Sequence, residues 1–322
     1  MSKFSIAVFG GGSVGLCLAA HFAKAGARVF LLVRQGSIEA IRGKPITVSG
    51  LLGDHIVPAE SYTVCDAAAP TAEVLGCDML VMTTKAYDLE KALDPFAKNE
   101  SRASILLLQN GLGSAEIARD VVGSKVAIYS SAMMIGMVRQ ALTSVEVTAQ
   151  SSPIFCGSLL GDSDEPLKDM LQVAEQGFVP MAQDPAIRET IAFKLLFNSC
   201  MNPTGALTGQ TYGELLENPQ SREFIVGLAD ETLAAYAKEF NYRPAENGQH
   251  YVDEVLSKII FPRAQGHRSS MLQDLQAGRR TEIDFLNGAI IRLADDAALP
   301  SVRHACISQL IKACEASKAF RQ

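Results

Sequence analysis

Three polar side chains recur at every fourth position of an otherwise apolar segment. Lys194, Asn198 and Asn202 lie in the run IAFKLLFNSCMNP, and residues four apart advance by only about 40° around an α-helix, so the three share one stripe. The apolar neighbours predict a buried helix, in which Lys and Asn need polar partners. A lysine in such a place can donate a proton to a carbonyl oxygen. The alternative is a solvent-facing stripe on an amphipathic helix. We expect Pro203 to end the helix.

An acidic residue in a later segment could complete this site. In the run SSMLQDLQAGRRTEID, Thr281 and Asp284 predict a capping box, which puts Glu282 in the first turn of a helix, where the helix dipole favours an acid. Helix capping alone would explain Glu282. If Glu282 instead lies opposite the buried lysine, it would tune the pKa of that lysine and bind a substrate hydroxyl.

A glycine-rich turn near the N-terminus predicts a phosphate-binding site. Gly10, Gly12 and Gly15 form GxGxxG between the apolar run Phe4–Phe9 and a helical pattern that stops at Gly26. In such turns the first glycine permits the tight turn, the second lets a pyrophosphate approach the backbone, and the third lets the helix pack on the strand. A purely structural glycine turn is the alternative, but its position between a first strand and a helix favours dinucleotide binding.

The residue after the second predicted strand indicates which dinucleotide binds. Val29–Val33 is followed by Arg34, where an NAD site usually carries an acid for the ribose 2′-hydroxyl. An arginine can pair with a 2′-phosphate through two N–H donors, so Arg34 favours NADP(H) over NAD and FAD. The alternative is an ordinary solvated arginine.

Two further loops follow predicted parallel strands, at the edge where open α/β sheets bind ligands. TTKAYD follows Met79–Met82, and its Lys85 could meet a cofactor phosphate or the adenine. QNGLG follows Ile105–Leu108, and its Asn110 could bond the nicotinamide ribose or the substrate. Asn-Gly is also a common turn signal.

The order of these patterns predicts an α/β protein with an N-terminal Rossmann-type, doubly wound parallel sheet and a C-terminal all-helical domain. A further strand is expected at Val126–Ile128. From Pro185 onward the sequence consists of long amphipathic stretches, and Asp184 followed by proline is typical of a helix start. We therefore predict two domains, 1–184 for the cofactor and 185–322 for the substrate and catalysis.

Composition narrows the function classes. The chain has 322 residues and a net charge of −6, with no basic run that could neutralise a phosphate backbone, so nucleic-acid binding is not expected. Seven cysteines without a CxxC favour reduced thiols, and no metal ion is predicted. The first apolar run is too short for a signal peptide or a membrane span, so we expect a cytoplasmic protein without a membrane partner.

Taken together, these motifs resemble the ketopantoate reductase (2-dehydropantoate 2-reductase) family in order and spacing over essentially the whole chain. The pieces that carry the resemblance are GGGSVG, Arg34, TTKAYD, QNGLG, the stripe of Lys194, Asn198 and Asn202, and SSMLQDLQAGRRTEID. The resemblance implies an NADP-dependent oxidoreductase of pantothenate and coenzyme A biosynthesis, with NADPH in the cleft between the two domains. It leaves a homodimer open.

The resemblance also implies roles for particular residues. Lys194 would be the general acid in hydride transfer to the C2 carbonyl, and Glu282 would hold the substrate hydroxyl or orient the lysine. Asn110 would lie near the nicotinamide and the substrate. The remaining implied contacts are Asn198, Asn202 and Ser270 for the substrate, and Arg34 and Lys85 for the 2′-phosphate end of the cofactor.

One position departs from the family pattern. Some members carry a further substrate-binding Asn after the catalytic helix, where this chain reads GQTYGEL, with Tyr212 near that place. The acyl pocket could therefore differ, and the alternatives are an NADPH-dependent reductase of another 2-keto acid, a related dehydrogenase of a hydroxy or sugar acid, or a non-catalytic NADP(H)-binding sensor. The sensor leaves the polar stripe unexplained.

Overall fold

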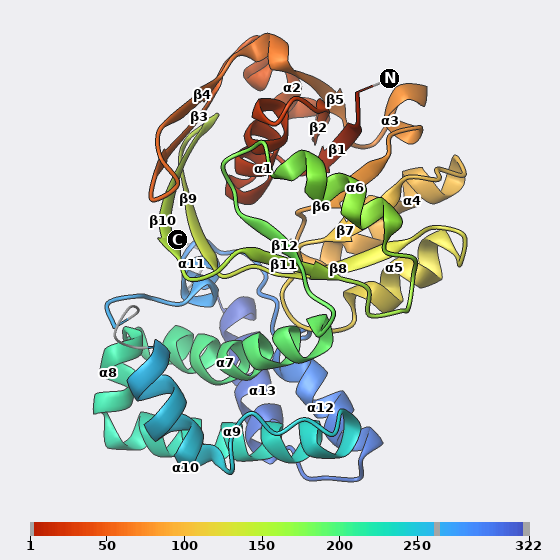
Figure 1. The fold of residues 1–322 in the computed structure, drawn as a ribbon. Helices are drawn as coiled ribbons and strands as arrows, with labels where there is room; N and C mark the ends of the chain where they lie inside the picture. The colour runs from red at the N-terminus through yellow and green to blue at the C-terminus, as the bar shows by residue number, and fades with distance from the viewer. Residues whose placement is uncertain (1–2, 261–264, 318–322) are drawn as a thin grey trace. The chain divides into compact units, whose positions relative to one another are not determined.

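The computed structural model describes residues 3–260 and 265–317, which form two compact units (Figure 1). Unit 1 takes the chain up to Gln109 and then Ser114–Thr190, and unit 2 takes Asn110–Gly113 and the chain from Ile191 onward. The chain thus passes into unit 2 within a long helix, six residues after Asp184. The last four residues of the QNGLG segment, Asn110–Gly113, also belong to unit 2 although they follow a strand of unit 1.

Unit 1 is built on an eight-stranded sheet of order β12-β11-β8-β7-β6-β1-β2-β5. All its neighbouring strands run parallel except β11 and β8, which are antiparallel. The prediction of a Rossmann-type sheet is confirmed, with one strand misplaced: β8 begins at Ile128, where the predicted strand ended. The strands are β1 (Ser5–Phe9), β2 (Arg28–Val33), β5 (Tyr62–Asp66), β6 (Met79–Met82), β7 (Ser104–Leu107), β8 (Ile128–Ala132), β11 (Ile154–Gly157) and β12 (Met181–Gln183).

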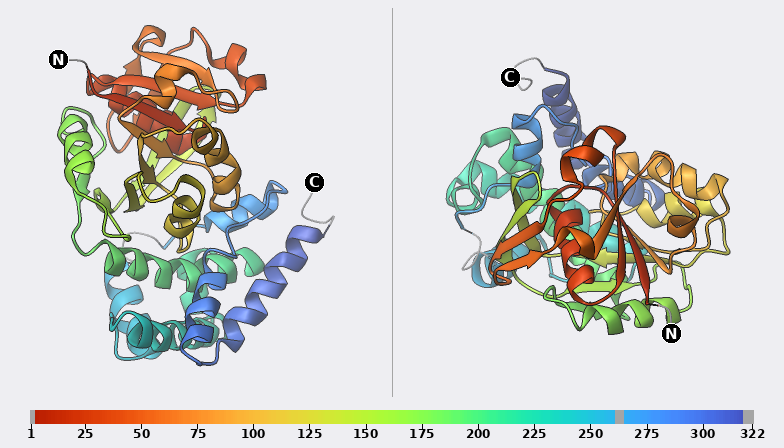
Figure 2. Two further views of the ribbon diagram at one scale, coloured as in Figure 1. Left: turned by 90° about the vertical axis from the view of Figure 1, so that its right-hand side faces the viewer. Right: turned by 90° about the horizontal axis from the view of Figure 1, so that it is seen from above.

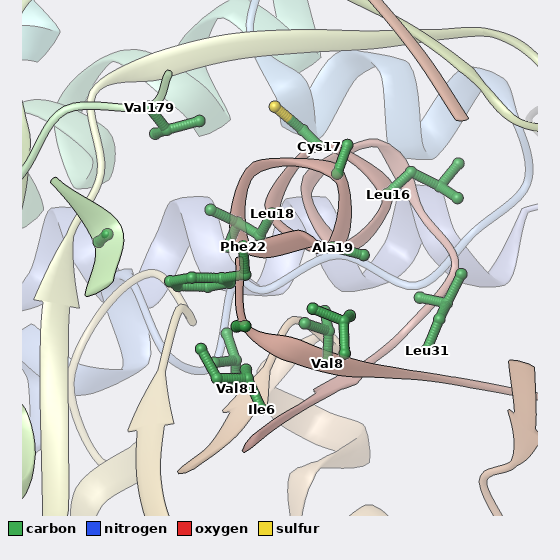
Figure 3. Packing of buried hydrophobic residues seen from close by; sticks show 14 of the residues in the cluster. Ile6, Val8, Leu16, Cys17, Leu18, Ala19, Phe22, Leu31, Val81 and Val179 are labelled. Atoms are coloured by element: carbon green, nitrogen blue, oxygen red, sulfur yellow. The ribbon is translucent and has the colours of Figure 1, made fainter. Parts of the chain in front are cut away.

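Helices cover both faces of this sheet. Successive strand residues point to opposite faces, and on β1 both sets are apolar and pack against helices. Ile6 and Val8 of β1 pack against Phe22 of α1 (Figure 3), whereas Ala7 joins the cluster that contains Phe96 of α4. The helical elements of unit 1 are α1 (Ser13–Lys24), α2 (Gln35–Ile41), η1 (Ala59–Ser61), α3 (Ala72–Leu75), η2 (Ala86–Asp88), α4 (Leu89–Lys98), α5 (Ser114–Val122) and α6 (Glu165–Ala174).

A second sheet in unit 1 was not predicted. It has the order β4-β3-β10-β9, and its strands β3, β4, β9 and β10 all contact α1. Valines from this sheet, among them Val48 and Val145, belong to the same cluster as α1, so the sheet buries the face of that helix that the large sheet leaves uncovered. Its strands are β3 (Ile46–Gly50), β4 (His55–Val57), β9 (Ile135–Ala141) and β10 (Ser144–Gln150).

Beyond β12, every regular element in residues 184–260 and 265–317 is helical, as the amphipathic stretches predicted (Figures 1 and 2). None of the helices in the described ranges combines the length and apolar composition that a membrane crossing needs. The elements are α7 (Ile187–Thr208), α8 (Tyr212–Glu217), α9 (Pro219–Glu239), α10 (Gly248–His250), the π-helical η3 (Tyr251–Ile260), α11 (Ser270–Gln276), α12 (Asn287–Asp296) and α13 (Val302–Ala316).

Two predictions about helix ends were wrong. Pro203 lies inside α7, which continues to Thr208. The capping box at Thr281 and Asp284 does not form: the Thr281 N–H donates to Glu315, and the Asp284 carboxylate accepts from Arg280 and pairs with Lys312. Glu282 therefore lies in a turn before α12 rather than in the first turn of a helix.

The glycine turn gives a test of the packing between α1 and β1. A Cβ atom on Gly15 would lie 1.9 Å from the carbonyl oxygen of Gly10, so the helix can approach the strand only without a side chain. Gly15→Ala should lower the free energy of unfolding by about 1–3 kcal/mol through overpacking, measured by urea denaturation.

The matched control is Gly36→Ala in the exposed helix α2, where a Cβ atom would meet nothing within 4 Å. That change should leave stability unchanged or raise it by up to about 1 kcal/mol, because alanine favours the helix over glycine. Equal responses of the two variants would contradict the packing role of Gly15.

Candidate active site

The turn between β1 and α1 has the features that a dinucleotide pyrophosphate requires. Gly10 has φ of 121°, and its Cβ atom would lie 2.5 Å from the Thr83 hydroxyl oxygen. Gly12, the N-cap of α1, has nothing within 4 Å of a Cβ position, so the backbone there is open to an approaching ligand. The first turn of α1 carries no acidic residue. The free N–H groups and positive end of this helix therefore fit a phosphate.

The predicted cofactor residues of unit 1 follow the carboxyl ends of its parallel strands. Arg34 is exposed at the N-cap of α2, directly after β2, and Lys85 is half-buried at the N-cap of η2, shortly after β6. Because β1 lies between β2 and β6 in the sheet, the two side chains start two strands apart along one edge. Gln109 follows β7 and donates from its amide nitrogen to the carbonyls of Met82 and Thr84.

The polar stripe on α7 is buried rather than solvent-facing. Asn198 is 8% exposed and Asn202 is 5% exposed, and Lys194 is half-buried. Their apolar neighbours on the same helix, such as Leu195 and Met201, belong to the core of unit 2. An amphipathic surface helix does not place amides at this depth, so the stripe needs polar partners.

Three of the predicted site residues meet within unit 2. The Lys194 ammonium donates to the Asn110 amide oxygen at 2.7 Å, and the Asn110 amide nitrogen lies 3.5 Å from a Glu282 carboxylate oxygen. The amide orientation is fixed, because an ammonium only donates and a carboxylate only accepts. Asn110 thus bridges the cation and the anion.

Burial changes the acidity of this lysine. Desolvation lowers the pKa of Lys194 from 10.5 to about 8, and the negative charge of Glu282 acts in the opposite direction and raises it. A lysine with a pKa of about 8 is mostly protonated at neutral pH and releases its proton more readily than a solvated one. This is the range that suits a general acid.

The other predicted substrate residues, Asn198, Asn202 and Ser270, each have different surroundings. The amide oxygen of Asn202 accepts the Tyr212 hydroxyl at 2.9 Å, so Tyr212 fixes the orientation of that amide. The amide of Asn198 has no hydrogen-bond partner among residues 3–260 and 265–317. Ser270 is exposed at the start of α11, and its neighbour Ser269 is the buried N-cap that accepts the Leu272 N–H.

Sequence reasoning missed how the Glu282 turn is held. The Glu282 carbonyl accepts the N–H groups of Phe285 and Leu286, and the Phe285 carbonyl accepts the Leu112 N–H from the QNGLG segment. A Cβ atom on Gly111 would lie 1.9 Å from the Phe285 carbonyl oxygen, so the Asn-Gly pair permits this close approach. The glycine after Asn110 was the available signal.

A Rossmann-type unit with an open glycine turn and a helical unit with a half-buried lysine fit a nucleotide-dependent oxidoreductase. The sequence model of "Ketopantoate reductase PanE/ApbA" matches residues 6–160, and that of its C-terminal domain matches residues 186–315. The chain belongs to the ketopantoate reductase family. A 2-dehydropantoate 2-reductase of Aquifex aeolicus is 27% identical over 310 residues, which are 96% of each chain.

Solved structures share the fold over nearly the whole chain. A probable 2-dehydropantoate 2-reductase of Bacillus subtilis is 25% identical with a TM-score of 0.77, covering 96% of this chain and 99% of its own. A D-mandelate dehydrogenase, solved with NADH and anilino(oxo)acetate, is 19% identical with a TM-score of 0.84, covering 99% and 100%. At that identity the second likeness concerns the fold alone.

The opposing effects on Lys194 give a pH prediction. Glu282→Gln removes the charge that raises the pKa of Lys194, so that pKa should fall further below its ordinary value. The measurement is an NMR titration of ¹³C-methylated lysines, with Lys194→Arg identifying the signal. Glu189→Gln, which changes an exposed acid on the same helix, is the control and should leave the Lys194 titration in place. A shift shared by both variants would contradict the specific effect of Glu282.

Proposed function

We propose that this protein reduces 2-dehydropantoate (ketopantoate) to pantoate with NADPH, a step of pantothenate and coenzyme A synthesis. The observation that carries the proposal is the half-buried Lys194, hydrogen-bonded to Asn110 beside Glu282, in a chain of the ketopantoate reductase family. A bound reduced nicotinamide would supply the hydride for the C2 carbonyl carbon.

Lys194 is then the general acid. As the carbonyl carbon accepts a hydride, its oxygen gains negative charge, and the ammonium group donates the proton that converts it to a hydroxyl. The hydrogen bond to Asn110 holds the ammonium in place, and the negative charge of Glu282 keeps it protonated at neutral pH. Protonated lysine is the active form, so the rate of reduction should fall as the pH rises through its pKa.

The remaining polar groups bind the substrate. Asn198 offers an amide that no described residue occupies, one helical turn from Lys194. Glu282 can accept the substrate hydroxyl while it acts on the lysine, and Ser270 at the start of α11 would be a further substrate contact. These assignments follow the family resemblance and the burial of the stripe.

Unit 1 would bind the cofactor. The open backbone at Gly12 and the N-terminus of α1 suit the pyrophosphate, and the exposed guanidinium of Arg34 suits the adenosine 2′-phosphate, with Lys85 on the same edge of the sheet. An acid for the ribose 2′-hydroxyl is absent from the position after β2, which supports NADPH over NADH.

A second candidate is the reduction of a different 2-keto acid. The Tyr212 hydroxyl donates a hydrogen bond to the Asn202 amide oxygen. The rings of Tyr212 and Phe197 meet edge to face, with centroids 5.3 Å apart. Tyr212 therefore uses one of the two lone pairs of the Asn202 oxygen and fixes its N–H donors in one direction, and an aromatic wall stands beside this amide. The aromatic wall favours a 2-keto acid with a more apolar acyl group than that of ketopantoate.

Removal of the proposed acid tests the mechanism. Lys194→Ala should lower kcat for NADPH-dependent reduction of ketopantoate by at least about 100-fold, the usual contribution of general acid catalysis. NADPH affinity should be unchanged, because the lysine belongs to unit 2. Lys258→Ala removes an exposed lysine paired with Glu254 and serves as the control with normal turnover. Normal turnover of Lys194→Ala would rule out the assigned role.

The cofactor assignment has its own test. Arg34→Gln should raise the Kd for NADPH by about 10- to 100-fold through the loss of charge-assisted hydrogen bonds, and should change the Kd for NADH little. Arg42→Gln is the control, because Arg42 is also exposed at an end of α2 and bonds Glu39. Equal weakening of NADPH and NADH by Arg34→Gln would refute the phosphate contact.

A further inference from the structure

Pro203 leaves a gap in the hydrogen bonds of α7. Proline has no N–H, so the carbonyl of Ser199, four residues earlier, lacks its usual helical donor. The gap lies in the part of the helix that carries Asn198 and Asn202, and Ser199 itself is fully buried. An unpaired carbonyl at this depth would cost about 1–3 kcal/mol.

A side chain from another helix fills the gap. The amide nitrogen of Asn287, the first residue of α12, donates to the Ser199 carbonyl at 2.9 Å. Its other N–H points to Nδ1 of His304 at 3.0 Å, and Nε2 of His304 lies 3.0 Å from the Leu228 carbonyl. Burial lowers the pKa of His304 to about 4, so the ring is neutral, with its proton on Nε2 and an acceptor at Nδ1.

The amide of Asn287 can be oriented only one way. Both partners of its nitrogen are acceptors, so a flipped amide would bring its oxygen against the Ser199 carbonyl. Its own oxygen is buried and has no hydrogen-bond partner among the described residues. The side chain therefore keeps one unsatisfied atom in order to supply two donors, which a leucine or alanine could not supply.

Asn287 also ends the turn that carries Glu282. The Phe285 carbonyl of the same turn accepts the N–H of Leu112, two residues after Asn110, so residues 282–287 touch both the QNGLG segment and α7. We propose that Asn287 is a positioning residue, which uses the carbonyl freed by Pro203 to hold the Glu282 turn in register with Lys194 on α7. The inference deepens the proposed function and rests on it only for its kinetic readout.

The main readouts are the Lys194 pKa and the stability of the full chain, because neither depends on the substrate being correct. Among residues 3–260 and 265–317, Glu282 is the charged group whose field raises the pKa of Lys194, and Asn110 beside it is uncharged. Asn287→Ala should let the turn move, lower the pKa of Lys194 as Glu282→Gln does, and lower kcat for ketopantoate by about 10- to 100-fold, since misplacement by about 1 Å has effects of that size.

A double variant separates positioning from simple hydrogen-bond satisfaction. Pro203→Ala restores a backbone N–H that can bond the Ser199 carbonyl. In Pro203→Ala/Asn287→Ala the part of the stability lost with the Ser199 bond should therefore recover, although Nδ1 of His304 still lacks its donor, whereas the Lys194 pKa and kcat should stay as in Asn287→Ala. Recovery of the pKa and kcat together with stability would overturn the proposal and leave Asn287 a structural donor only.

Tyr236→Phe is the matched control. It removes another buried side-chain donor to a carbonyl of α7, that of Ala192, but does not touch the Glu282 turn. It should leave the Lys194 titration unchanged, and a shift as large as that of Asn287→Ala would contradict the proposal. If the Lys194 titration and the stability change among these variants as expected, but the wild type reduces no ketopantoate, the result would count against the proposed substrate and not against the positioning role of Asn287.

Discussion

A half-buried ammonium group in a largely apolar helical core is the constraint on which unit 2 depends. The ammonium of Lys194 is stabilised there by the hydrogen bond that it donates to the Asn110 amide oxygen, with 2.7 Å between nitrogen and oxygen, and by the charge of Glu282, which opposes the cost of desolvation. Each partner comes from a different part of the chain. The rest of unit 2 can be understood as the means of keeping these three groups together.

The turn at residues 282–287 is the structural centre of that arrangement. It carries the Glu282 carboxylate, bonds the backbone of the QNGLG segment, and ends at Asn287, which bonds α7 behind Pro203. If a helix began at Thr281, residues 282–287 would be its first turns and would not form this turn before α12. The failure of the predicted capping box is thus part of how the site is built, since local rules are often broken at functional sites.

Patterns that are local in sequence were predicted well. GxGxxG, the strand at Met79–Met82 and the stripe of Lys194, Asn198 and Asn202 depend on neighbours within a few residues, and the structure has a glycine turn, a strand and a buried stripe there. That Asn110 meets a lysine 84 positions later could not be derived, because it depends on packing between distant segments.

The errors of the sequence-based prediction also come from contacts between segments that are distant in the chain. Pro203 was expected to end α7, but the helix continues to Thr208, and the Ser199 carbonyl that lacks its helical donor is bonded by Asn287, 88 residues away. The β3–β4 and β9–β10 strand pairs are joined by the parallel pairing of β3 and β10, and no sequence period relates these segments. The roles of the site residues in binding and catalysis remain predictions from the chemistry of their side chains.

The measurement that tests the central claim most directly is the initial rate of NADPH absorbance loss by the purified protein with ketopantoate, beside pyruvate, 2-ketoisovalerate and an aromatic 2-keto acid. The account predicts rapid turnover with ketopantoate and much slower turnover with the others. Turnover selective for another 2-keto acid would move the substrate to the alternative that Tyr212 favours, and binding of NADPH without turnover of any of them would contradict the assignment as a 2-keto acid reductase.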